Sequence, residues 1–171
     1  MSFIPLPIDS ISGAAITIAY EHAQIHAGLT FFYADSNTIG SGSSQDYLIT
    51  TPANKYVHFV FNADGSAVTS MYLYEGADRT GTTQQTTYNS NRLSATVAST
   101  TVAKGTSAGT TDGTRLVIYA GGTATNQSRS GTDFGFAGEL ILKQSTKYLL
   151  RITSGTAGNL CNVNMRWYEN S

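Results

Sequence analysis

Residues 161–168 read Cys-Asn-Val-Asn-Met-Arg-Trp-Tyr, and apolar and polar side chains alternate through the whole stretch. Successive side chains of a β-strand point to opposite faces of its sheet, whereas those of a helix repeat every ~3.6 residues. The stretch is therefore predicted to be a strand with one buried face. That face consists of Cys161, Val163, Met165 and Trp167. The opposite, polar face consists of Asn162, Asn164, Arg166 and Tyr168.

The same alternation predicts a hairpin over residues 55–75. Val57, Phe59 and Phe61 share one face of its first strand. Tyr56, His58 and Val60 share the other, and residues 62–65 supply the turn. Further strands are predicted over residues 15–20, 29–33, 46–50, 114–120, 134–143 and 147–153, with residues 21–26 as one turn of helix or irregular chain. About eight strands joined by Gly-, Ser-, Thr- and Asn-rich loops are typical of an antiparallel β-sandwich or jelly roll.

The 171 residues suffice for one domain, which we expect over residues 14–171. Residues 1–13 are predicted to form an extended arm, because two prolines alternate with large apolar side chains. Those side chains are Phe3, Ile4, Leu6 and Ile8. The alternative is a frayed terminus, the common fate of first residues. Residues 76–91 and 121–131 are predicted to be flexible loops, and residues 93–112 to be an edge strand or a loop.

The composition excludes several classes of function. Charged residues are 12% of the chain, about half the usual share, and serine and threonine together supply about a quarter of the residues. A net charge of −1 provides no electrostatic footprint for nucleic acid or anionic lipid. The single Cys161 excludes an internal disulfide and a multi-cysteine zinc site. No segment reads as a membrane span or a secretion signal, so we expect a protein made in the cytoplasm.

Candidate catalytic residues are few. Residues 105–109 read Gly-Thr-Ser-Ala-Gly, which matches the nucleophile elbow of esterases at Ser107. That motif needs a helix directly after the serine, and residues 110–113 lead into another strand instead. An esterase remains a third hypothesis, and we expect no enzymatic activity.

The other reactive side chains also favour structural roles. His22 and His26 have zinc-ligand spacing only on a helix, since four strand residues span about 13 Å. His58 and Cys161 are expected in the core. The carboxylates at strand ends, Glu75, Glu139 and Glu169, are expected in solvent. No catalytic, cofactor-binding or metal-ligating residue is therefore predicted. Exposed tyrosines at 72, 74 and 168 fit either a sugar-stacking platform or a subunit interface.

A series of short motifs in a fixed order resembles a family of small structural proteins of tailed-bacteriophage virions. These motifs lie at Thr17–Gly28, Thr50–His58, Leu73–Gly76, Tyr88–Arg92, Ser128–Gly131, Glu139–Thr153 and Trp167–Glu169. The resemblance implies a head decoration, or cement, protein: a β-sandwich module bound to the outside of the capsid.

This resemblance implies a location on the outer surface of the virion, with the major capsid protein as partner. A homotrimer is expected, with a dimer as the rival, and neither nucleic acid nor membrane is an expected partner. The apolar arm from Phe3 to Ile8 is the expected contact with the capsid or a neighbouring subunit, and residues 121–131 are expected to face outward or a neighbour. The alternative function is a tail or fibre module that binds host-surface glycans.

Overall fold

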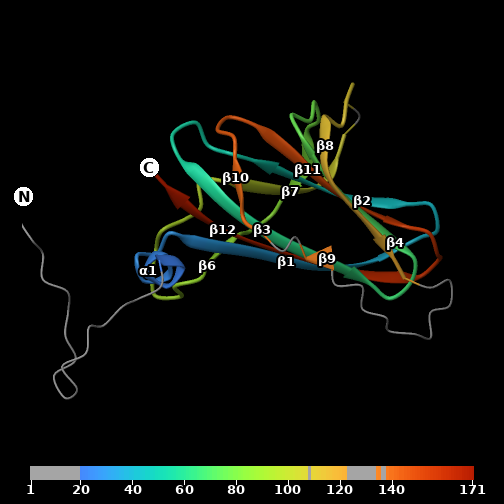
Figure 1. Cartoon of the computed structure of the whole chain (residues 1–171), viewed down its shortest axis with the longest axis horizontal. Coiled ribbons are helices and arrows are strands. Elements are labelled where there is room, and N and C mark those ends of the chain that lie inside the picture. Colours follow the sequence, from blue (N-terminus) through green and yellow to red (C-terminus); the bar gives the residue numbers. More distant parts are fainter. Residues whose placement is uncertain (1–19, 108, 123–133, 136–137) are drawn as a thin grey trace, which may run out of the picture.

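The computed structural model describes residues 20–107, 109–122, 134–135 and 138–171, which form two antiparallel sheets packed face to face (Figure 1). The sheet that we call the β12 sheet has the order β10 (Leu140–Leu142), β3 (Tyr56–Gly65), β12 (Asn159–Asn170), β1 (Thr30–Ile39), β6 (Tyr88–Asn89), and β9 (Phe134–Gly135) also pairs with β3. The β11 sheet has the order β5 (Gly81–Gln84), β7 (Thr101–Thr106), β2 (Ser44–Thr50), β11 (Lys147–Ser154), β4 (Thr69–Glu75), β8 (Thr114–Gly121).

The strand pairs are nested along the chain in the manner of a jelly roll. β1 pairs with β12, and β2 pairs with β11. Inside these, β3 pairs with β10, and β4 pairs with β8. The first and third of these pairs join in one sheet and the second and fourth in the other, which is the arrangement of two interlocked Greek keys. The predicted all-β sandwich of jelly-roll type is thus confirmed.

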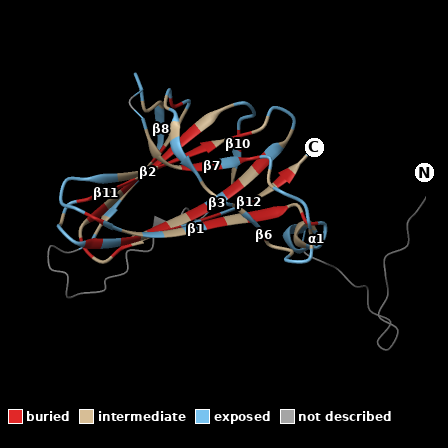
Figure 2. Ribbon diagram, turned by 180° about the vertical axis from the view of Figure 1, so that it is seen from behind, coloured by how far each residue is buried: buried red, intermediate tan, exposed pale blue. Residues whose placement is uncertain are grey.

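The core lies between the sheets and is built from the predicted faces. Cys161, Val163, Met165 and Trp167 are all buried, as are Val57, Phe59 and Phe61 (Figure 2). The opposing side chains come from the β11 sheet and include Ile49, Met71, Leu73, Leu150 and Ile152. Each such side chain stabilises the fold by about 1.5–3 kcal/mol on burial, so the two inner faces hold the layers together.

Several predicted elements differ from the structure. The predicted loop 76–91 contains the short strands β5 and β6. The single strand predicted over residues 134–143 is interrupted, with β9 and β10 at its two ends. Residues 101–106, within the segment predicted to be an edge strand or a loop, form the strand β7, which lies between β5 and β2 and not at an edge. Tyr20, predicted to end a strand, begins a helix instead. The arm 1–13 and most of the loop 121–131 lie outside the described residues.

The predicted helical turn is present as α1 (Tyr20–His26). Two residues after its end, Gly28 has a φ of 71°, the left-handed conformation that commonly follows a helix. Tyr20 makes an edge contact with Tyr168, so α1 lies against the outer face of the β12 sheet. No helix in the described part of the chain is long and apolar enough to cross a membrane.

Candidate functional site

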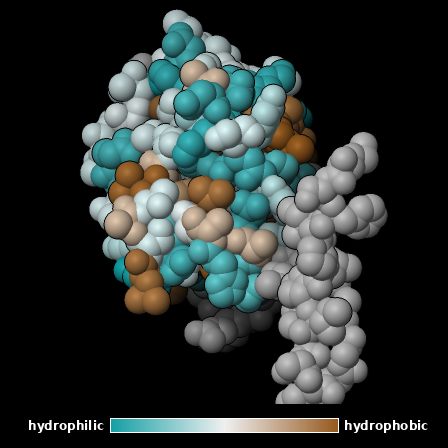
Figure 3. All heavy atoms as spheres, turned by 90° about the vertical axis from the view of Figure 1, so that its left-hand side faces the viewer, coloured by the Kyte–Doolittle hydropathy of each residue, from teal (hydrophilic) through white to brown (hydrophobic). Residues whose placement is uncertain are grey.

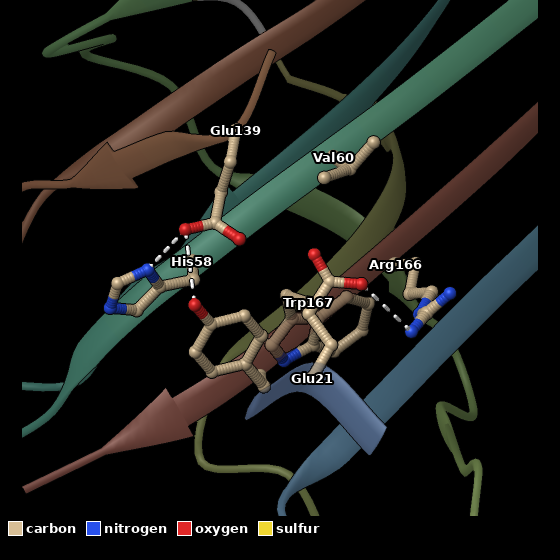
Figure 4. Close-up of a pocket in the computed structure, with 7 residues that line it drawn as sticks. Glu21, His58, Val60, Glu139, Arg166 and Trp167 are labelled. Atoms are coloured by element: carbon tan, nitrogen blue, oxygen red, sulfur yellow. Dashed lines mark hydrogen bonds and ion pairs between the residues drawn. The ribbon is translucent and has the colours of Figure 1, made fainter. Parts of the chain in front are cut away.

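A pocket of about 230 Å³ opens on the outer face of the β12 sheet, beside α1 (Figure 4). Cross-strand pairing assembles it, because Tyr168 lies opposite His58 and Arg166 lies opposite Val60. Glu21 reaches it from α1, and Glu139 reaches it from the residue before β10. Residues that are up to 147 positions apart in the sequence thus line one cavity, counting from Glu21 to Tyr168.

Three side chains of the pocket form a connected group. The rings of His58 and Tyr168 stack with their centroids 4.3 Å apart. Glu139 Oε1 accepts a hydrogen bond from the Tyr168 hydroxyl at 3.1 Å and lies 2.5 Å from Nδ1 of His58. Partial burial, followed by the hydrogen bond to Glu139, raises the pKa of Tyr168 to about 12. The phenol therefore remains a neutral donor, and the prediction of a core histidine at position 58 is wrong: its half-buried ring lies on the outer face.

The open side of the pocket has opposite charges. Glu21 and Arg166 approach to 4.0 Å, and both side chains are more than half exposed. An exposed pair at this distance is weak, so both groups can turn toward a ligand. None of the lining residues is a serine, threonine, cysteine or lysine, so the pocket offers hydrogen bonds and an aromatic surface without a nucleophile of those types.

The other predicted chemical sites do not assemble. Ser107 donates its hydroxyl to the carbonyl of Thr80, and residues 109–113 form no helix after it. His22 and His26 do lie on a helix, with their Nε2 atoms 2.9 Å apart. However, no group of three His, Cys, Asp or Glu side chains suited to a metal ion occurs among the described residues.

The three tyrosines also separate into two places. Tyr72 and Tyr74 lie on the outer face of the β11 sheet with ring centroids 6.1 Å apart, whereas Tyr168 lies on the β12 sheet. Beside them, Arg151 binds Asp46 at 2.7 Å and Asp112 at 2.6 Å. One platform of three tyrosines is therefore excluded by the fold.

A second feature lies near α1: the segment of residues 90–99, which we call the 90–99 loop. Leu93 is 98% exposed and Val97 is 81% exposed, and these are the two most exposed large apolar residues in the described part of the chain. Figure 3 views the molecule from the α1 side, where apolar groups stand apart on a mostly polar surface. Sequence reasoning did not single out either residue, because apolar side chains in a Ser- and Thr-rich segment show no period.

Asparagine side chains hold the 90–99 loop in shape. Asn89 donates to the carbonyls of Gly28 and Thr96 at 2.8 and 3.0 Å. Its oxygen accepts the backbone N–H of Asn91, whose own side-chain oxygen accepts the N–H of Leu93. Each bond satisfies a backbone group that regular secondary structure would otherwise pair, so the loop is ordered without being a strand.

Glu169 holds the far end of the 90–99 loop. Its carboxylate is fully enclosed and accepts hydrogen bonds from the N–H groups of Ser99 and Thr100, while Lys55 Nζ lies 3.1 Å away. Trp167 Nε1 adds a further bond at 3.2 Å. Burial alone would raise the pKa of Glu169, but the bonds from Thr100, Ser99 and Lys55 outweigh it and lower the pKa below its ordinary value. The prediction of a solvated carboxylate is wrong here.

The two other carboxylates of that prediction are also engaged. Glu75 accepts hydrogen bonds from Lys143 at 2.7 Å and from the Tyr148 hydroxyl at 2.9 Å. Glu139 belongs to the pocket. Cys161 is buried as predicted, and burial raises the pKa of its thiol.

No protein-family model, no curated protein and no solved structure matches the chain.

Proposed function

We propose that the chain is a bacteriophage head decoration protein that binds the outside of the capsid and stabilises the shell. The observation that supports this most directly is the ordered 90–99 loop with its exposed Leu93 and Val97. Large apolar side chains held out by a rigid segment favour protein association, since little conformational freedom is lost on binding. The ordered sequence motifs described above support the same role, as does a sandwich of jelly-roll type.

The major capsid protein is the proposed partner, and the outer surface of the virion the proposed location after synthesis in the host cytoplasm. A protein that binds the assembled shell but not its separate subunits shifts the equilibrium toward the shell. Many copies, arranged as trimers or dimers on the symmetry axes of the capsid, would add avidity to each contact.

Replacing both loop side chains tests the contact. The double variant Leu93→Ser/Val97→Ser is expected to bind purified capsids about 30-fold more weakly or worse, because burying each side chain supplies about 1–3 kcal/mol. The matched control is Leu160→Ser. Leu160 is also exposed, but it lies at the start of β12, whereas Glu169, which binds the 90–99 loop, lies at its end. Unchanged binding by the double variant would remove the 90–99 loop from the contact.

Immunogold labelling of intact virions tests the location. Antibody against the purified chain is expected to place gold over the whole head. Gold confined to the tail would contradict the decoration role and favour the second function below.

The pocket at Tyr168 supports the second candidate, a tail or fibre module that binds host-surface glycans. Its volume suits a single sugar ring, and carboxylate, guanidinium and phenol groups are frequent partners of sugar hydroxyls. For this function, saturable binding to host envelopes is expected to disappear in Arg166→Ala and to persist in Leu93→Ser. Equal binding by both variants would exclude the pocket as the glycan site.

A further inference from the structure

β8 is longer than the strands at the three other edges of the two sheets. β5, β6 and β10 end their sheets with four, two and three residues. β8 has eight residues, and β4 is its one neighbour in the sheet order of the described strands. Two of its large apolar side chains are also exposed, Leu116 by 44% and Ile118 by 51%. Long apolar edges pair readily with other strands, and proteins usually protect them with short strands, prolines or charges.

The arm of this chain has the pattern of a strand that pairs on one side only. Residues 3–8 read Phe-Ile-Pro-Leu-Pro-Ile. In an extended strand, the N–H groups of alternate residues point to opposite edges. Pro5 and Pro7 fall on the same edge and have no N–H, so that edge cannot form a ladder. Ile4, Leu6 and Ile8 present their N–H and C=O groups at the other edge.

We infer that residues 4–8 of one copy add as a strand to β8 of a second copy. Ile4, Leu6 and Ile8 would supply the ladder hydrogen bonds, and the arm would cover Leu116 and Ile118. The prolines would then face outward and end the sheet, so that no further chain adds. This pairing goes beyond capsid binding and holds whether or not the protein decorates a capsid.

The position of α1 explains the choice of a second copy. The described chain begins at α1 on the outer face of the β12 sheet, whereas β8 ends the β11 sheet, and Figures 1 and 2 show the two well apart. Residues 9–19 span at most about 40 Å when extended, enough to reach an adjacent molecule. Copies that exchange arms around a two-fold or three-fold axis satisfy every β8 edge and leave no open end.

Two matched pairs of variants of the full chain test the inference. Light scattering measures the molar mass of each in solution and so distinguishes a monomer from an oligomer. Ile4→Pro removes a donor from the pairing edge, whereas Phe3→Pro removes one from the edge already blocked. Ile118→Lys places a charge on β8, whereas Ile141→Lys places it on β10, at an isoleucine that is somewhat more exposed. We expect a closed oligomer for the unmodified chain, Phe3→Pro and Ile141→Lys, and monomers for Ile4→Pro and Ile118→Lys.

Mixing distinguishes exchange between copies from pairing within one copy. Ile4→Pro retains an intact β8 and Ile118→Lys retains an intact arm, so the mixture is expected to form a one-to-one heterodimer. A monomeric unmodified chain, unchanged mass in Ile4→Pro, or a mixture that stays monomeric would each overturn the inference. Position 4 does not belong to the described residues that form the sandwich, so a folding defect of Ile118→Lys would leave the first comparison intact.

Discussion

Glu169 binds the end of the 90–99 loop and Lys55, and the sequence indicates only part of this role. The alternation of residues 161–167 continues to position 169, so its inward direction could have been inferred from parity alone. Its partners could not, since Lys55 and Thr100 are 114 and 69 positions away. The pairing of His58 with Glu139 was hidden for the same reason: the sequence predicts a core histidine and a solvated carboxylate, and nothing local indicates that they meet.

Replacement of Glu169 by glutamine should loosen the 90–99 loop. The amide retains the shape but loses the charge that Lys55 and the two backbone N–H groups bind. We expect the free energy of unfolding to fall by about 2–4 kcal/mol, measured in urea, with faster hydrogen exchange at residues 90–100. The control, Glu139→Gln at the exposed pocket, should cost under about 1 kcal/mol. Equal losses in the two variants would contradict the role of Glu169.

The lowered pKa of Glu169 also predicts that the free energy of unfolding falls in acid. The pKa of Glu169 is lower in the folded chain than its ordinary value of 4.5, so the unfolded chain binds protons more readily. Its stabilisation is complete above that ordinary value and is lost as the pH falls through the folded pKa. The pKa values of Asp35, Glu75 and Asp112 are lowered as well and add to this trend. Urea titrations from neutral pH to about pH 3 should therefore show falling stability, with a shallower slope in Glu169→Gln.

At the scale of elements, long strands could be predicted from the sequence and very short ones could not. β3 and β12 alternate over ten and twelve residues, and the apolar faces predicted for residues 57–61 and 161–167 are the buried ones. β11 is equally recognisable as a strand, but three successive residues, Tyr148, Leu149 and Leu150, are buried, so its sequence indicates no single buried face. β5 and β6 are too short to show a period and consist of polar or small residues that are also common in loops. Their strand character depends on the neighbours with which they pair, so the sequence of those residues alone does not indicate it.

The junction between α1 and the 90–99 loop depends on Gly28. Alanine there would have to adopt a positive φ, and its Cβ would collide with the side chain of Ser94. We expect Gly28→Ala to lower the free energy of unfolding by about 1–2 kcal/mol. Gly42→Ala is the matched control, because Gly42 has the same φ sign but open space around it and should lose less. A larger loss in the Gly42 variant would exclude the collision as the cause.

For the whole molecule, the sequence was sufficient to predict a jelly-roll type of sandwich, but not which residues pair across neighbouring strands. Pairing of β1 with β12 joins Thr30 to Tyr168, and no local pattern specifies such a distant partner. Closing these long loops is entropically costly before the contacts form, so folding should be slow and the two sheets should form together.

The single Trp167 reports on this cooperativity, because its side chain lies between the sheets. We expect its fluorescence and the far-UV circular dichroism to change at the same urea concentration, and refolding to take milliseconds to seconds or longer. Two separate transitions would mean that the sheets unfold independently.

The buried thiol of Cys161 provides a chemical measure of how often the sandwich opens. A maleimide reagent cannot reach the sulfur while β12 is paired on both sides, so labelling proceeds only during rare openings of the sandwich. The labelling rate therefore reports how readily the sandwich opens around this sulfur, and it requires no substitution in the chain. If attachment to a shell or exchange of arms suppresses opening, the same reaction on assembled particles will slow in proportion, and the ratio of the two rates will measure the protection that assembly confers.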